Sequence, residues 1–334
     1  MAQPTARDVA CDPDWLPHSY DVGGENLTFV QVPREARQDL MFLSEEHYQG
    51  RFPKAALPAS AVAAELDPAQ RAPLHFIFHT AFCGSTLLAR ALTAAGVAET
   101  LREPDVLINL ANRLARSDDA TNRERLELVL KLLERPLASG EAVIVKPTNF
   151  ANRLLEPVLE TRPESRAALL YSDLETFLRS LARRGVAGRR FGRQMYLQFA
   201  SWMPVDFGLG PAEMFELTDL QIAGLAWLLQ IAHFNSVAGK EGGRLLVLDV
   251  SELMADTAEV LGRVQGLFGL NLDAQAIASG PIFSTHSKFA DQEYGVAQRA
   301  LDHEKVTETH GEEIALVVQW IGAVAAQLGL PLKP

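Results

Sequence analysis

The chain has 334 residues, of which 48% are hydrophobic, enough to bury the core of one large α/β domain with insertions. Its formal net charge of −11 argues against a general nucleic-acid binder, because such proteins are expected to be basic. Its two cysteines, Cys11 and Cys83, make no disulfide framework, and residues 1–17 contain no apolar run of the signal-peptide kind. We therefore expect a cytoplasmic protein that binds no membrane.

Residues 1–72 differ in pattern from the rest of the chain. Residues 27–32 alternate between apolar and polar side chains, which predicts a strand, and residues 34–48 could form a helix. Four prolines between residues 53 and 73, with an alanine-rich helix among them, indicate a connector. We expect residues 1–72 to form an N-terminal lid or sub-domain packed on a core of residues 73–334.

The chain is organised around residues 74–92. Leu74–Phe78 is an apolar run typical of a buried parallel strand, a loop of small residues follows to Gly84, and Ser85 opens an amphipathic helix expected to end at Gly96. The first turn of a helix has backbone N–H groups without partners, so a phosphate group could bind there. The alternative is an ordinary strand-to-helix turn with a serine cap.

Strands and helices then alternate along the chain. We expect strands over residues 142–145, 167–171 and 245–248, and helices over residues 104–116, 121–137, 150–160, 173–184, 219–238, 257–268 and 312–328. The apolar stretch 220–237 is interrupted by polar residues, as in a core helix. This order predicts a three-layer α/β/α fold with a central, mostly parallel sheet. The loops after Phe78, Val145, Tyr171 and Leu248 should share one rim, where ligands bind in such folds.

The loop after the predicted strand Leu74–Phe78 is not a Walker A motif, because Gly84 stands where that motif has its lysine. Its sequence Gly84-Ser85-Thr86-Leu87-Leu88 resembles the 5′-phosphosulfate loop of sulfotransferases that use 3′-phosphoadenosine 5′-phosphosulfate (PAPS). The chain departs from that pattern at Phe82, which replaces a basic residue. The resemblance implies a P-loop NTPase-like sulfotransferase fold, PAPS as the donor, no metal, and donor contacts from Thr80, Phe82, Cys83, Gly84, Ser85 and Thr86.

Two further segments resemble the same family. The resemblance implies that Glu103, in Arg102-Glu103-Pro104, is the general base for the acceptor hydroxyl. It also implies that Lys146, in Lys146-Pro147-Thr148, stabilises the departing phosphate oxygen. The structural alternatives are a helix-start carboxylate for Glu103 and a solvated strand-end lysine for Lys146.

The segment from Tyr171 to Ser180 resembles the part of these enzymes that holds the 3′-phosphate of PAPS. Asp173 and Ser180 match the family, whereas Ser172 replaces an arginine. We expect Ser172, Ser180 and Arg184 to contact the donor, the alternative being a solvated basic surface.

Residues 244–270 resemble the strand and helix that follow in the family, and His286-Ser287-Lys288 resembles a segment that closes over the nucleotide. This resemblance implies an acid/base role for His286 and a phosphate contact for Lys288, the alternative being a surface loop.

Taken together, the motifs predict an enzyme that transfers a sulfuryl group from PAPS to a hydroxyl group of a small molecule or carbohydrate. Two alternatives stay open. A P-loop kinase or other nucleotide-dependent transferase would bind Mg²⁺–ATP, but the Walker lysine is missing and Asp249 is the clearest acidic strand end. A non-catalytic nucleotide-binding module could have kept the loop without its basic partners. The acceptor and the oligomeric state are left open.

Overall fold

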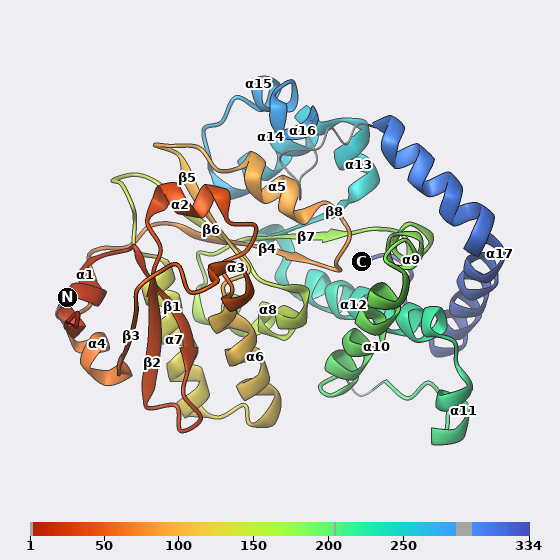
Figure 1. Ribbon diagram of the computed structural model, residues 1–334, viewed down its shortest axis with the longest axis horizontal. Coiled ribbons are helices and arrows are strands. Elements are labelled where there is room, and N and C mark those ends of the chain that lie inside the picture. Colours follow the sequence, from red (N-terminus) through yellow and green to blue (C-terminus); the bar gives the residue numbers. More distant parts are fainter. Residues whose placement is uncertain (1–2, 204, 285–295) are drawn as a thin grey trace. The chain divides into compact units, whose positions relative to one another are not determined.

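A computed structural model describes residues 3–203, 205–284 and 296–334, without the side chains of 284 and 296–307 (Figure 1). The chain forms two compact units. The first contains Met1–Phe78, Leu88–Ala167 and Val264–Asp273. The second contains His79–Leu87, Ala168–Arg263 and Ala274–Pro334.

The five-stranded sheet has the strand order β5-β6-β4-β7-β8, and helices flank it. Its strands are β4 (Leu74–His79), β5 (Ala98–Arg102), β6 (Ala142–Lys146), β7 (Ala167–Tyr171) and β8 (Leu245–Asp249). Both β4 and β5 pair in parallel with β6, with Phe76 and Leu101 opposite Val145. Every residue of β4, β5, β6 and β7 is buried, as expected for strands covered on both faces. The predicted α/β fold with a parallel central sheet is therefore confirmed.

The first unit also contains a three-stranded antiparallel sheet of β1 (Trp15–Tyr20), β2 (Asn26–Gln31) and β3 (Lys54–Pro58). The helices of this unit include α1 (Ala6–Cys11), α4 (Ala59–Glu65), α6 (Asp105–Arg116), α7 (Ala120–Leu133) and α8 (Leu155–Thr161). The single helix predicted over residues 34–48 is wrong. It is two short helices, α2 (Arg34–Asp39) and α3 (Glu45–Tyr48), because Leu40 is extended and Arg102 binds the carbonyl groups of Arg37 and Leu40.

Two other predicted helix boundaries in this unit differ for local reasons. The helix α5 (Ser85–Ala91) ends before Gly96, because Ala94 and Ala98 form an antiparallel bridge with Gly96 in the turn between them. The helix predicted over residues 150–160 is a 3₁₀ turn, Asn149–Leu154, followed by α8. Pro157 lies in the first turn of α8, where the missing N–H group does no harm, whereas the interior of one long helix would exclude it.

The second unit is built mainly of helices, namely α9 (Leu174–Ala182), α10 (Gly185–Ala200), α11 (Pro211–Glu216), α12 (Asp219–Glu241), α13 (Val250–Ala255), α15 (Ala274–Ala278), α16 (Pro281–Ser284) and α17 (Val296–Leu328). The helix α14 (Thr257–Phe268) begins in this unit and ends in the first. Residues 185–200 were not expected to be helical, and α17 begins well before residue 312.

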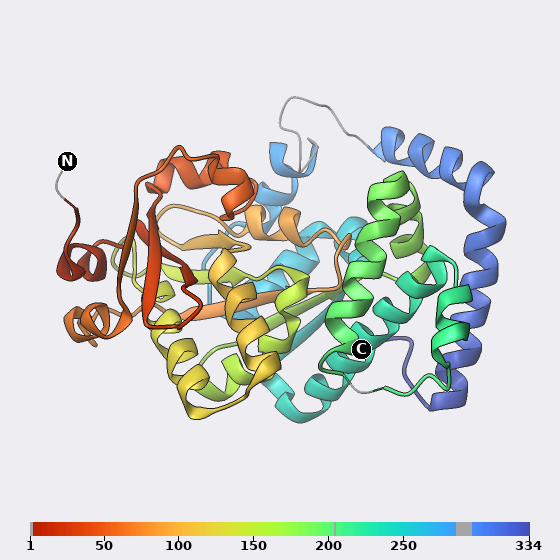
Figure 2. The same ribbon diagram turned by 60° about the horizontal axis from the view of Figure 1, so that its bottom comes forward.

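The helix α12 packs against both α10 and α17 within the second unit, as Figure 2 shows together with Figure 1. A Cβ atom at Gly192 of α10 would lie 2.8 Å from the Cβ of Ala223, so only glycine permits this close approach. By length and composition α12 could cross a membrane, but 72% of its apolar window is buried inside the protein. It is therefore the core helix that its polar interruptions predict.

Candidate active site

The loop that follows β4 adopts an unusual backbone conformation. Ala81, Phe82 and Gly84 have φ values of 70°, 54° and 74°, all in the left-handed region. Such a conformation costs a non-glycine residue roughly 1–3 kcal/mol and persists only where the surrounding structure imposes it. Here His79 Nδ1 accepts a hydrogen bond of 3.1 Å from the amide of Ala81, and the Thr80 amide donates to the Leu170 carbonyl over 3.0 Å. The loop is thus held at both its start and its strained centre.

The polar groups of this loop are buried, and there is little room for a side chain at Gly84. Ser85 and Thr86 are buried at the start of α5. A Cβ atom at Gly84 would lie 3.2 Å from Val250 Cγ2, a tight contact in addition to the strain of a positive φ. Cys83 is buried and its Sγ lies 3.4 Å from the Leu170 carbonyl oxygen, which fits a packed thiol rather than a reactive one.

Two hydroxyl groups of the second unit lack partners among the residues that the structure describes. Thr80 and Ser172 are both 0% exposed, and neither Thr80 Oγ1 nor Ser172 Oγ makes a hydrogen bond within the described parts of the chain. An unsatisfied buried hydroxyl costs about 1–3 kcal/mol, so such groups need an explanation. Sulfate and phosphate oxygens accept hydrogen bonds, so they are suitable partners for a hydroxyl donor of this kind. These residues therefore fit the donor that the sequence predicts.

The ring of Phe82 lies beneath a guanidinium group. The Cζ atom of Arg184 is 4.7 Å from the centroid of the Phe82 ring, and the rings of Phe177 and Phe191 lie 5.9 and 5.5 Å from it. Arg184 is exposed to solvent, although partial desolvation and the nearby charge of Arg183 lower its pKa, and a guanidinium stays protonated in proteins. Positive charge thus lies directly over the residue that replaces the basic residue of the sulfotransferase loop.

Three other arginines of α9 and α10 have carboxylate partners. Arg179 pairs with Glu175 at 2.5 Å, and both Arg189 and Arg193 pair with Asp219. Asp173 caps α9 by accepting a hydrogen bond of 2.9 Å from the Thr176 amide, and Ser180 is half-buried on the same helix. His286 and Lys288, for which acid/base and phosphate-binding roles are predicted, lie outside the described residues.

The first unit places Glu103 directly beside Lys146. Because Arg102 pairs with Lys146 in the parallel sheet, the next residue can reach back, and the Glu103 amide donates to the Lys146 carbonyl over 2.6 Å. Glu103 has a φ of 51°, and its Oε1 lies 2.5 Å from Lys146 Nζ. The side chain of Lys146 is 0% exposed and that of Glu103 is 18% exposed. Lys146 is therefore not a solvated strand-end lysine, and the carboxylate in the first turn of α6 is that of Asp105.

Two further features, one in each unit, have no counterpart among the predicted site residues. The ring of Phe42 lies 5.4 Å from Lys146 Nζ, although no motif in residues 1–72 indicates it. Tyr171, at the end of β7, is hydrogen-bonded to Asp249, and burial raises the pKa of its hydroxyl to about 12. In the parts of the chain that the structure describes, no group of three or more His, Cys, Asp or Glu side chains could hold a metal ion.

No protein-family model matches the chain, and neither does any curated protein. Among solved structures, a sulfotransferase domain of the curacin biosynthetic pathway is 13% identical with a TM-score of 0.43 and covers 79% of this chain and 100% of its own. Sulfotransferase STF1 of Mycobacterium tuberculosis H37Rv is 14% identical with a TM-score of 0.42, over 71% of this chain and 76% of its own. Mouse sulfotransferase SULT7A1, in complex with PAP, is 10% identical with a TM-score of 0.37, over 74% of this chain and 89% of its own. Each of these three solved proteins is a sulfotransferase.

Proposed function

We propose that this chain is a cytoplasmic sulfotransferase that transfers a sulfuryl group from PAPS to a hydroxyl group of a small molecule or carbohydrate. The observation that carries the proposal is the Arg184 guanidinium 4.7 Å above the ring of Phe82, because it returns positive charge to a loop that lacks its basic residue. The unsatisfied hydroxyls of Thr80 and Ser172 support it further.

The donor would be held by the loop, by Ser172 directly after β7 and by residues on and just beyond α9. Gly84 permits close approach of the backbone, Ser85 and Thr86 offer hydroxyl donors, and Arg184 offers a positive charge beside Phe82. Ser180 would complete the contacts from α9. When bound, PAPS supplies a sulfuryl group whose bond to the 5′-phosphate oxygen breaks during transfer.

Glu103 would take the proton of the acceptor hydroxyl as the acceptor oxygen forms its bond to sulfur. The products are a sulfate ester, adenosine 3′,5′-bisphosphate and a proton on the Glu103 carboxylate. Lys146 would stabilise the negative charge that collects on the leaving oxygen, and its ion pair with Glu103 keeps that carboxylate oriented. The reaction needs no metal ion.

Calorimetric titration with adenosine 3′,5′-bisphosphate, compared with Mg²⁺–ATP, tests the donor class. We expect the bisphosphate to bind more tightly than Mg²⁺–ATP, because the loop has no lysine to reach a γ-phosphate. Tighter binding of Mg²⁺–ATP would favour a kinase or another nucleotide-dependent transferase. If neither ligand binds, the chain is not a PAPS enzyme.

An Arg184→Met variant tests whether this arginine replaces the missing basic residue. We expect the affinity for adenosine 3′,5′-bisphosphate to fall about 10- to 100-fold, since a charge-assisted contact contributes about 1.5–3 kcal/mol. Arg190→Met is the matched control, because Arg190 of α10 is exposed as Arg184 is, whereas Arg184 is the arginine that lies over Phe82, and it should bind as the wild type does. Equal affinities of the two variants would remove Arg184 from the donor site.

A further inference from the structure

Two residues of the N-terminal segment, Phe42 and Leu43, contact Lys146 and the neighbours of Glu103 within the first unit. The Leu43 amide donates to the Arg102 carbonyl over 2.7 Å, and the Asp105 amide donates to the Leu43 carbonyl over 3.2 Å. The main chain of Leu43 is therefore hydrogen-bonded on both sides of Glu103. Phe42, the residue before it, places its ring 5.4 Å from Lys146 Nζ.

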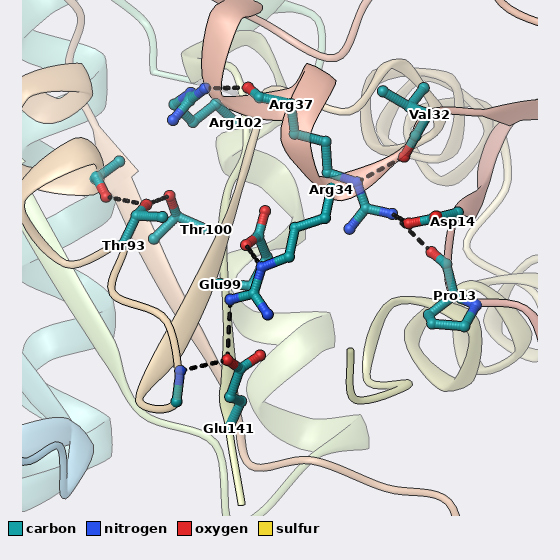
Figure 3. A network of polar contacts seen from close by, with 12 residues as sticks. Pro13, Asp14, Val32, Arg34, Arg37, Thr93, Glu99, Thr100, Arg102 and Glu141 are labelled. Atoms are coloured by element: carbon teal, nitrogen blue, oxygen red, sulfur yellow. Dashed lines mark hydrogen bonds and ion pairs between the residues drawn. The ribbon is translucent and has the colours of Figure 1, made fainter. Parts of the chain in front are cut away.

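The side chain of Arg102 also binds the main chain of residues 37–41. It is buried, and its Nη2 donates to the carbonyls of Arg37 and Leu40 at 2.5 and 2.7 Å, while its Nε donates to that of Met41 at 3.3 Å. Figure 3 shows the contact between Arg102 and Arg37. A buried guanidinium bound to several carbonyls holds them in one arrangement, because releasing any of them would leave a charged donor unsatisfied.

The segment is also anchored beyond Leu43. The amide of Glu45, the first residue of α3, donates to Asp105 Oδ2 over 2.7 Å. Residues 37–45 are thus bound to the chain before Glu103, through Arg102, and to the chain after it, through Asp105. These contacts help to offset the strain of a glutamate with a φ of 51°.

We infer that residues 37–45 are a fixed wall of the acid/base site, in which Leu43 locks the backbone of Glu103 and Phe42 keeps water from Lys146. Phe42 is in this sense a positioning residue, since it acts through Lys146 and Glu103. Lys146 is fully buried whereas Glu103 keeps 18% of its side chain exposed, so the carboxylate is the member of the pair that an acceptor can reach. A dry ammonium beside an aromatic face binds its carboxylate more strongly than a hydrated one. The catalytic meaning of this wall rests on the proposed function, but its existence does not.

The cover over Lys146 is tested by chemical labelling of lysines with an amine-reactive ester, followed by mass spectrometry. In the wild type we expect slow labelling of Lys146 relative to Lys131, whose side chain is 52% exposed. In Phe42→Ala, Lys146 should label at least about tenfold faster, because an unhindered amine becomes reachable. Phe42→Tyr should restore slow labelling. If Phe42→Ala labels Lys146 no faster than the wild type, Phe42 does not cover it.

Phe52→Ala is the matched control for that experiment. Phe52 is a half-buried ring of the same segment that contacts Tyr48 and Arg51, and its loss should leave the labelling of Lys146 unchanged. Phe42→Val removes part of the ring volume and serves if Phe42→Ala does not fold, and it should also speed the labelling of Lys146. Faster labelling in Phe52→Ala as well would mean general loosening, and it would overturn the specific role of Phe42.

Measurements of kcat and KM distinguish a failure of this inference from a failure of the proposed function. Once binding of adenosine 3′,5′-bisphosphate and an acceptor are established, we expect Phe42→Ala to lower kcat about tenfold without changing the KM for the donor, and Phe42→Tyr to restore it. Wild-type kcat in Phe42→Ala would overturn the positioning role although the donor binds. If the wild type binds no bisphosphate, the proposed function fails, while the labelling experiment still decides whether Phe42 covers Lys146.

Discussion

A Glu103→Gln variant is expected to lose about 10²- to 10⁴-fold in kcat while it binds adenosine 3′,5′-bisphosphate as tightly as the wild type. An amide has the shape of the carboxylate but cannot take a proton from the acceptor hydroxyl, so the loss should fall on the chemical step. The measurement is steady-state transfer with a confirmed acceptor, together with calorimetric titration of the bisphosphate.

Glu46→Gln is the control for this variant, because Glu46 is an exposed glutamate of α3, and it should leave both kcat and affinity unchanged. The amide at position 103 also deprives the buried Lys146 ammonium of its counter-charge, so Glu103→Gln should unfold at lower urea concentration than Glu46→Gln. Full turnover by Glu103→Gln would show that this residue is not the base and would leave it only its structural ion pair.

The central strands could be predicted because runs of consecutive apolar residues indicate that a strand is buried on both faces. Residues 142–145 and 167–171 are apolar throughout, and residues 74–78 are apolar except for the buried His75, as the interior of a doubly covered parallel sheet favours. The strand β5 was missed for the opposite reason, since it contains Glu99 and Arg102, which the sequence pattern alone marks as surface residues. Both are buried because their partners come from residues 34–41, more than sixty positions away.

The candidate site divides in the same way. The Gly84-Ser85-Thr86 loop and the strand-end positions of Glu103 and Lys146 are local patterns, so they could be named from the sequence. The contact of Arg184 with Phe82 joins residues about a hundred positions apart. The sequence predicts that Arg184 contacts the donor, but it does not predict that Arg184 lies over Phe82. Phe42 could not be found at all, because its position depends on the carbonyl groups that Arg102 binds rather than on any motif around it.

The largest effect on stability is expected from Arg34, which joins two buried carboxylates in the first unit (Figure 3). Its Nε lies 3.3 Å from Glu99 Oε2 and its Nη2 lies 2.9 Å from Glu141 Oε1. Glu99 is 2% exposed and Glu141 is 1% exposed, so neither can be hydrated if the arginine is removed. Arg34 joins β5 and the residue before β6 to the N-terminal segment.

An Arg34→Met variant is expected to lose about 3–5 kcal/mol of unfolding free energy at neutral pH, because it leaves two buried charges without their shared partner. The measurement is urea-induced unfolding followed by circular dichroism. Arg123→Met is the control. Arg123 also joins two carboxylates, Asp118 and Glu160, but on the surface, so this change should cost about 1 kcal/mol or less.

The loss of unfolding free energy in Arg34→Met should increase as the pH rises. Burial raises the pKa of Glu99 above its ordinary value of 4.5, although Arg37 opposes the shift, and removing Arg34 removes a second opposing charge. A carboxyl group with a raised pKa in the folded state destabilises the protein above that pKa and ceases to do so once it is protonated. The deficit should therefore be largest at about pH 8 and shrink at about pH 5.

Adding Glu99→Gln and Glu141→Gln to Arg34→Met should recover most of the loss at about pH 8, because no buried charge then remains without its partner. A deficit that stays constant with pH, or that the two amides do not reduce, would mean that Arg34 stabilises the unit by packing rather than by charge.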